Sequence, residues 1–179
     1  MANNWVAGND LIKGNDYFLY LVDISNSDSG MTSGMVSTSK VVAYAQSCSM
    51  EINADTLDVT SKLSCRWNAV LPGNASYTVN SDSLYCKKAN ADANSAYTID
   101  HLFEDMVAGN NIGWVMAQDS AATATTAECG EIWGPDTTLP YYWGEAAITS
   151  LSINAGNNEI VNSSITLTGS GRPHQGGNS

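Results

Sequence analysis

The sequence predicts a mainly β protein: an antiparallel β-sandwich or partly closed barrel with one packed α-helix. Three observations lead to this class. Short apolar segments with strand-like alternation recur along the chain. Helical periodicity is confined to residues 97–111. Only 14% of the 179 residues are charged, so the polar surface consists mainly of Asn, Ser, Thr and Gly, which favour strands and turns. We expect one domain over residues 1–179.

Residues 17–24 and 41–53 are predicted to pair as a long hairpin. The first segment, YFLYLVDI, is rich in aromatic and branched residues. In the second, apolar and polar residues alternate, with Val42, Tyr44, Cys48, Met50 and Ile52 on one face. The intervening residues 25–39 are mostly small and polar, which predicts a loop at the hairpin tip.

The central part of the chain contains a predicted corner, a turn, a strand and the helix. Residues 56–62, TLDVTSK, are expected to form the corner, and Leu-Pro-Gly at 71–73 a turn before a strand at 77–85. The helix is expected at 98–108, with Thr98 as its cap and Gly109 as its stop. Its apolar residues are predicted to form one apolar stripe: Ile99, Leu102, Phe103, Met106 and Val107.

The remaining strands are expected near the C-terminal end. Residues 112–118 form one strand, followed by a long loop over 119–140 with weak strand character at 128–133. Residues 142–153 and 159–168 form a closing hairpin, because Asn-Ala-Gly-Asn-Asn between them is a hairpin signal. Residues 169–179 are expected to be a flexible tail, on composition.

The charge balance argues against nucleic-acid binding by attraction. Eighteen acidic residues face seven basic ones, a formal net charge of −11. A phosphate-binding surface needs clustered Lys and Arg, and the one adjacent basic pair is Lys87-Lys88. Acidity can repel nucleic acid or simply keep a protein soluble. The first residues do not resemble a signal peptide, and we expect no membrane insertion.

The strongest enzymatic reading uses Cys48 or Cys129 as nucleophile and His101 as base. His101 stands beside Asp100 at the start of the helix, where a role near the cap is the simpler reading. The four cysteines include no C-x-x-C pair, and no calcium-loop pattern occurs. We therefore predict no catalytic, cofactor or metal site, and we expect the thiols to be reduced.

The aromatic residues leave a third possibility open. They could form a sugar-binding platform, as in a carbohydrate-binding β-sandwich, or they could anchor a protein–protein interface. The candidates are Trp67, Trp114, Trp133, Tyr141, Tyr142 and Trp143.

Four segments, in order, resemble the major tail (tail tube) proteins of long-tailed bacteriophages. They are VVAYAQSCSMEINADTLDVTSK, RWNAVLPGNASYTVNSDSLY, YTIDHLFEDMVAGNNIGWVMA and GEAAITSLSINAGNNEIVNSSITLTGSGRP. The chain departs from the pattern at Cys65, at Asn68 and in the loops 25–39 and 119–140. The inner-tube proteins of contractile tails and injection machines share the fold and are the alternative relatives.

The resemblance implies a structural virion protein of the tail, assembled in the host cytoplasm. Its barrels would close into hexameric rings that stack into a tube, through which DNA is ejected without specific binding. Partners would be further copies, the tape-measure protein, the tail terminator, and baseplate or distal tail proteins. No catalysis or cofactor is implied.

Two sets of residues are our site candidates under this reading. The ring-interface candidates are Thr56, Asp58, Thr60, Ser61, Lys62, Trp67, Met31, Met35 and Val36. The loop at 25–39 is either an arm that docks on the adjacent ring or a mobile tip. The acidic residues expected to face the lumen are Glu51, Asp82 and Glu145, with Asp55 and Asp119 as secondary candidates. These carboxylates could instead face the outer solvent.

Overall fold

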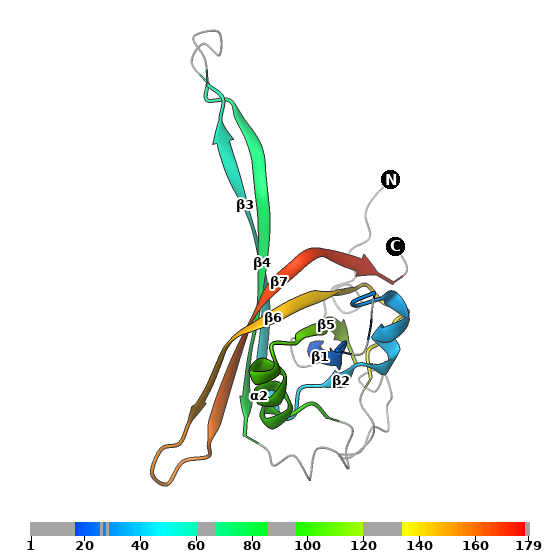
Figure 1. Ribbon diagram of the computed structural model, residues 1–179, viewed down its shortest axis with the longest axis vertical. Helices are drawn as coiled ribbons and strands as arrows, with labels where there is room; N and C mark the ends of the chain where they lie inside the picture. The colour runs from blue at the N-terminus through cyan, green and yellow to red at the C-terminus, as the bar shows by residue number, and fades with distance from the viewer. Residues whose placement is uncertain are drawn as a thin grey trace, which may run out of the picture.

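The computed structural model describes residues 17–25, 27, 29–60, 67–85, 96–119 and 134–177. Seven strands form one sheet in the order β2-β1-β5-β6-β7-β4-β3, and every pairing between them is antiparallel (Figure 1). The mainly β class is therefore confirmed. The strands are β1 (Tyr17–Asp23), β2 (Lys40–Val41), β3 (Ala45–Asp58), β4 (Val70–Leu84), β5 (Asn111–Gln118), β6 (Tyr141–Asn154) and β7 (Asn162–Gly176).

The main core lies on one face of this sheet, under the helix α2 (Ile99–Ala108). The sheet curls around it, so that Cys48 Sγ on β3 lies 3.6 Å from the Tyr17 carbonyl oxygen on β1, although these strands are not paired. The buried members from the sheet are Leu19, Leu21, Tyr77, Val79, Ile112, Trp114, Met116, Ala146, Ile148, Ile165 and Leu167. The alternation of each strand supplies this face, as expected for a half-buried sheet.

The helix α2 begins and ends where the sequence predicts. The Thr98 N–H donates to Nδ1 of His101 (3.3 Å), and Thr98 Oγ1 lies 2.7 Å from the same nitrogen. Gly109 ends the helix with a φ of 74°. The predicted apolar stripe is only partly buried, however. Ile99 and Leu102 are buried, whereas the remaining three members, Phe103, Met106 and Val107, are exposed.

A second, smaller core covers the other face of β1 and β5. Tyr20, Val22, Val115 and Ala117 pack there with residues of the loop 25–39, which contains the 3-10 helix η2 (Ser33–Thr38). Met31 and Val36 are buried in this core and Met35 packs against it. These three side chains pack inside their own subunit, and a ring contact through them stays a prediction.

The strands β3 and β4 continue far beyond the body of the protein as a two-stranded ribbon (Figure 1). The strand β7 pairs with β4 only over Thr78–Leu84, so residues 70–77 of β4 have β3 as their paired neighbour in the described structure. We call residues 52–60 and 67–76 the arm. All of its β3 residues are exposed, and its β4 residues are exposed or partly exposed.

Three predicted features of the topology are wrong. The predicted 17–24/41–53 hairpin is limited to Lys40 and Val41, because a turn at 42–44, with Tyr44 at φ 50°, breaks the strand. The Leu-Pro-Gly sequence at 71–73 lies inside β4, at a register shift opposite Asp55. Proline is tolerated there because no strand pairs with the second edge of β4 over residues 70–77 in the described structure. An N–H on that edge would have no carbonyl to donate to. The predicted flexible tail is strand as far as Gly176.

Tyr77 fixes the point at which the arm leaves the body. Its hydroxyl donates to the Glu145 carbonyl of β6 and accepts from Trp114 Nε1 (3.3 Å) of β5. Its ring lies directly over Gly169 of β7, where a Cβ would overlap it. One buried side chain on β4 thus contacts β5, β6 and β7.

We expect Gly169→Ala to destabilise the fold by about 1–3 kcal/mol, because the added methyl group must push the Tyr77 ring out of its place. Urea denaturation of the purified chain measures this free energy of unfolding. Gly134→Ala is the matched control, since a Cβ at Gly134 meets nothing within 4 Å. Equal stability of the two variants would contradict the role of this contact.

Candidate assembly surface

The end of the arm carries an apolar cluster that the subunit itself does not bury. Leu57 and Leu71 are directly paired across the two strands and are 59% and 54% exposed. Val59 comes directly after β3 and continues the pairing, since its N–H donates to the Ala69 carbonyl. Its side chain lies on the same face as Leu57, since strand side chains alternate, and is also exposed. We call Leu57, Val59 and Leu71 the arm patch. Large apolar side chains gathered on a protruding ribbon are typical of an interaction surface.

The predicted interface residues of the segment 56–67 lie on this arm where the structure describes them. Thr56, Asp58, Thr60 and Trp67 are exposed, while Ser61 and Lys62 lie outside the described residues. The predicted corner at 56–62 is instead the end of β3, since Thr56–Asp58 are strand.

Asp58 and Thr60 are engaged in holding the end of the arm. The Thr60 N–H donates to Asp58 Oδ1 (2.8 Å), and the Ala69 N–H donates to Thr60 Oγ1 (3.0 Å). The hydrogen bonds from Thr60 lower the pKa of the Asp58 carboxyl. Asp58 and Thr60 therefore brace the ribbon near its tip.

A second surface is the outward face of β3, β4, β7 and β6, opposite the main core. Directly paired residues form a row across all four strands: Ser47, Asp82, Ser164 and Ser152. Side chains hydrogen-bond along it, Ser47 to Asp82 at 2.9 Å and Ser152 to Ser164 at 2.7 Å. The next rows are Ser49, Asn80, Thr166 and Ser150, then Glu51, Thr78, Thr168 and Ala147. We call these three rows the hydroxyl face.

The structure brings two of the predicted lumen residues together on the hydroxyl face. Glu51 and Asp82 are exposed on neighbouring strands, and the three rows contain no Lys or Arg. The surface is therefore polar and negatively charged, and most of its side chains are short.

Glu145, Asp55 and Asp119 lie elsewhere. Glu145 Oε1 accepts from Asn111 Nδ2 (2.8 Å), and its other carboxylate oxygen lies where a side chain on Gly30 would project. Asp55 is on the arm. Asp119 is fully buried, so it does not face a lumen in this subunit and that prediction is wrong.

The structure gives no support to a Cys–His pair. His101 Nδ1 is engaged at the helix cap by Thr98, and Cys129 lies outside the described residues. Cys48 packs against the main core, and burial raises the pKa of its thiol, which lowers the reactive thiolate fraction. Among the described residues, no group of three or more His, Cys, Asp and Glu is arranged to hold a metal ion.

The aromatic candidates that the structure describes do not gather into one platform. Trp114 and Tyr141 are buried, Trp143 stacks on His174 with ring centroids 4.4 Å apart, and Trp67 is exposed on the arm. Trp133 lies outside the described residues. In the described part of the chain, no helix has the length and apolarity that a membrane crossing requires.

Sequence reasoning missed the arm patch and the exposed side of α2. The alternation of apolar and polar residues in Leu57, Asp58 and Val59 indicates a strand with one apolar face. The prediction of a corner at 56–62 does not use this signal. The exposed side of α2 could have been suspected because apolar residues extend too far around the helix for one sheet to cover.

We expect Cys48 to react at least tenfold more slowly with a thiol reagent in the native chain than in urea at neutral pH. Its pKa is raised by burial, so the thiolate becomes abundant only above the ordinary range near 8.5. Peptide-resolved mass spectrometry after timed alkylation measures the rate. Rapid native labelling would revive the nucleophile reading.

Neither a scan against protein-family models nor a search of curated proteins found a match. Solved structures do match. The tail of an empty GTA particle, determined with C6 symmetry, superposes with a TM-score of 0.61 at 16% identity, covering 92% of this chain and 98% of that one. A protein of the native gene transfer agent virion gives 0.60 at 15%, with 92% and 98% coverage. The SPP1 tail tube gives 0.60 at 15%, with 94% and 80% coverage. The chain has the fold of the tail tube proteins.

Proposed function

We propose that this chain is a structural tail tube protein. Six copies form a ring, and the rings stack into the tube that conducts the viral genome into the host cell. The likeness to tail assemblies over more than nine-tenths of the chain supports this reading. One of those tails was determined with C6 symmetry, which favours a six-membered ring here.

The observation that carries the proposal is the unpartnered arm. A two-stranded ribbon is marginal in water on its own, and this one exposes the arm patch at its end. Burying a large apolar side chain contributes about 1.5–3 kcal/mol. In a repeating assembly, every copy would bury its arm patch and gain this free energy, whereas an isolated subunit leaves the patch exposed to water.

The edges of the sheet offer the lateral contact. In the described structure, β3 pairs only with β4, which leaves its other edge open over Ala45–Asp58. At the opposite edge, β2 is only two residues long. Exposed strand edges promote pairing between chains. We infer that the barrel predicted from the sequence is completed between copies in the ring.

We assign the hydroxyl face to the lumen. Six copies at −11 each would give a ring a formal charge of −66. Glu51 and Asp82 would repel DNA phosphates, and the absence of Lys and Arg from the three rows would prevent adhesion. Screening confines this repulsion to about 8 Å at physiological salt, so it acts near the wall. Glu145, which also faces away from the main core, is a rim candidate.

The remaining roles follow from the tube. The tape-measure protein would occupy the lumen during assembly, and the terminator and the baseplate or distal tail proteins would bind the two ends. The chain would be assembled in the host cytoplasm and reside in the virion tail. This role requires no catalysis, cofactor or metal.

Shortening the arm should abolish tubes while leaving a folded subunit. Asn53 and Ser76 are directly paired, so residues 54–75 can be replaced by an Asn-Gly turn that closes the hairpin. The core is untouched by this change, and we expect a cooperative thermal transition by circular dichroism. Negative-stain microscopy should show tubes for the native chain and none for the variant. Full-length tubes from the shortened chain would overturn the role of the arm.

Replacing Glu51 and Asp82 with Lys should slow DNA ejection without preventing tube assembly. Each reversal adds two charges, so six copies add 24 positive charges to the proposed lumen of every ring. Ejection is followed by fluorescence of DNA released from virions built with the variant.

Asp23→Lys with Glu159→Lys is the matched control for this experiment. Both residues are exposed, lie outside the hydroxyl face and change the net charge equally. We expect ejection at the native rate for the control. Equal ejection rates for both double variants would contradict the lumen assignment.

A further inference from the structure

Tyr44 is held in a backbone conformation that suits few residues. Its φ is 50°, in the left-handed region where the Cβ of an L-residue crowds the carbonyl oxygen that follows. Among the described residues, the other positive φ values belong to glycines and to Asn158, at 64°, and both residue types tolerate this region. A bulky side chain there is a strained outlier, and such outliers gather at functional sites.

The isolated subunit makes no use of the Tyr44 side chain. This side chain is 64% exposed and belongs to none of the apolar cores, and its hydroxyl makes no hydrogen bond in the described structure. Only the backbone is engaged, since the Tyr44 carbonyl accepts from the Leu84 N–H (3.1 Å). An Asn or a Gly would form the same turn with less strain. The subunit alone therefore gives no reason for a tyrosine at this position.

We propose that Tyr44 is an anchor residue for the contact with the adjacent copy in the ring. This inference rests on the proposed function and adds to it a residue that determines how strongly neighbours bind. The strand β3 begins at Ala45, directly after Tyr44, and no described strand pairs with its second edge. A neighbour that pairs with this edge comes next to the Tyr44 ring. Tyrosine is frequent among interface anchors because it combines a large apolar ring with a hydrogen-bonding hydroxyl.

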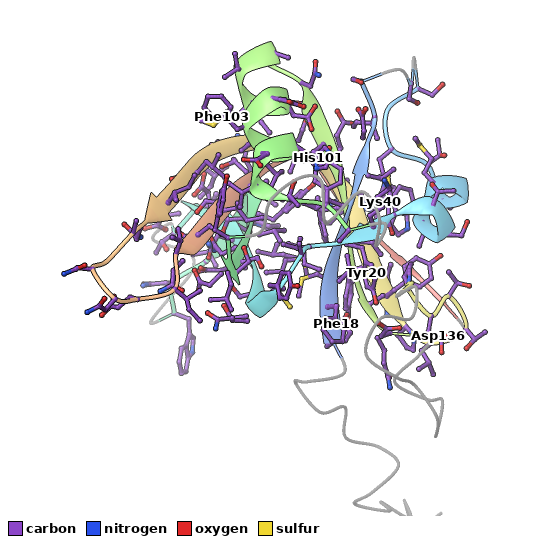
Figure 2. The ribbon with its side chains drawn as sticks, turned by 90° about the horizontal axis from the view of Figure 1, so that it is seen from below. Phe18, Tyr20, Lys40, His101, Phe103 and Asp136 are labelled. Atoms are coloured by element: carbon purple, nitrogen blue, oxygen red, sulfur yellow. The ribbon has the colours of Figure 1, made fainter. Side chains whose placement is uncertain are left out.

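The charge pattern around Tyr44 favours a second copy as the partner. Residues 41–50 contain no charged side chain. This stretch is bounded by Lys40, which Figure 2 shows on β2, and by Glu51. Two chains that each carry a net charge of −11 repel each other, and like charges brought together at an interface weaken binding. An uncharged stretch with an exposed aromatic ring is a place where two such chains can come into contact.

Replacing Tyr44 separates assembly from stability. Tyr44→Asn removes the ring and relieves the strain, so we expect a melting temperature between the native value and about 3 °C above it. We expect the same variant to form at least about tenfold less tube, because an interface anchor is lost. Tyr44→Phe keeps the aromatic contact and should still form tubes. Circular dichroism measures the melting temperature, and sedimentation with negative-stain imaging measures the tube yield.

Asn158→Tyr is the matched control. It places a tyrosine in the same left-handed region, at an exposed position in the connection between β6 and β7. We expect it to lower the melting temperature by about 2–6 °C and to leave the tube yield at the native level. A native melting temperature would show that a tyrosine adopts this conformation without strain, and it would overturn the inference.

Cross-linking identifies the copy that Tyr44 touches. A benzophenone-bearing phenylalanine in place of Tyr44 becomes linked, on illumination of assembled tubes, to the chain that its ring contacts. Contacts between adjacent copies in a closed ring of six give a ladder of linked chains that ends at the hexamer, whereas contacts between rings give a ladder that continues along the tube. We expect the ladder that ends at the hexamer.

The outcomes separate this inference from the proposed function. Native tube yield from Tyr44→Asn, a lowered melting temperature for that variant, or a ladder that continues beyond the hexamer would overturn the anchor role, while tubes from the native chain uphold the function. An equal loss of tube from Asn158→Tyr would also overturn it, because assembly would then not depend on Tyr44 in particular. If the native chain forms neither rings nor tubes under any condition, the proposed function fails and the anchor role fails with it.

Discussion

The arm depends on the place where Tyr77 crosses the sheet. Beyond this residue β4 no longer has β7 beside it, and the ribbon leaves the body. The hydroxyl of Tyr77 joins β6 and β5, and its ring occupies the space that Gly169 leaves open. A small change of orientation at the base of a long ribbon displaces its end by a large distance. The direction of the arm therefore depends on how firmly Tyr77 holds the base. The proposed contact between copies needs a well-defined arm direction, because interface energy depends on complementarity at the contact.

The two faces of the sheet show how a low-charge sequence serves two purposes. The inward side chains of β3, β4, β6 and β7 contribute to a core under α2, while the outward ones form hydrogen-bonded rows of hydroxyls. Short hydroxyl side chains satisfy one another across strands without long, mobile charges. The same strand residues therefore produce stability on one side and a smooth polar wall on the other, by alternation alone.

Local features of the fold could be predicted from the sequence, and pairing partners could not. The cap at Thr98, the stop at Gly109 and the position of most strands follow from residue chemistry within a few positions. The hairpin between 17–24 and 41–53 is predicted because these two segments follow one another in the chain, and strands that are neighbours in sequence often pair. A left-handed residue at Tyr44, which is not a typical signal for φ above zero, breaks the strand and sends β3 to β4. The Gly and Ser content of residues 169–176 predicts a flexible tail. The pairing with Tyr141–Glu145 that makes this segment a strand is not visible in its composition.

The ring-interface prediction for Thr56, Asp58 and Thr60 stays a prediction, and the structure places these residues on the exposed arm. The residues of 56–62 fit no catalytic or ligand-binding pattern, which favours a contact surface, but the sequence does not predict the protruding ribbon. Two of the polar residues expected to bind a neighbour, Asp58 and Thr60, also brace the ribbon. The apolar residues between them remain for contact. This division has a physical reason: hydrogen bonds satisfied within a ribbon keep it extended before assembly, so association does not have to supply the ordering entropy. In the proposed tube, copies of this acidic chain repel one another and rely on local apolar contacts, which ionic screening does not weaken.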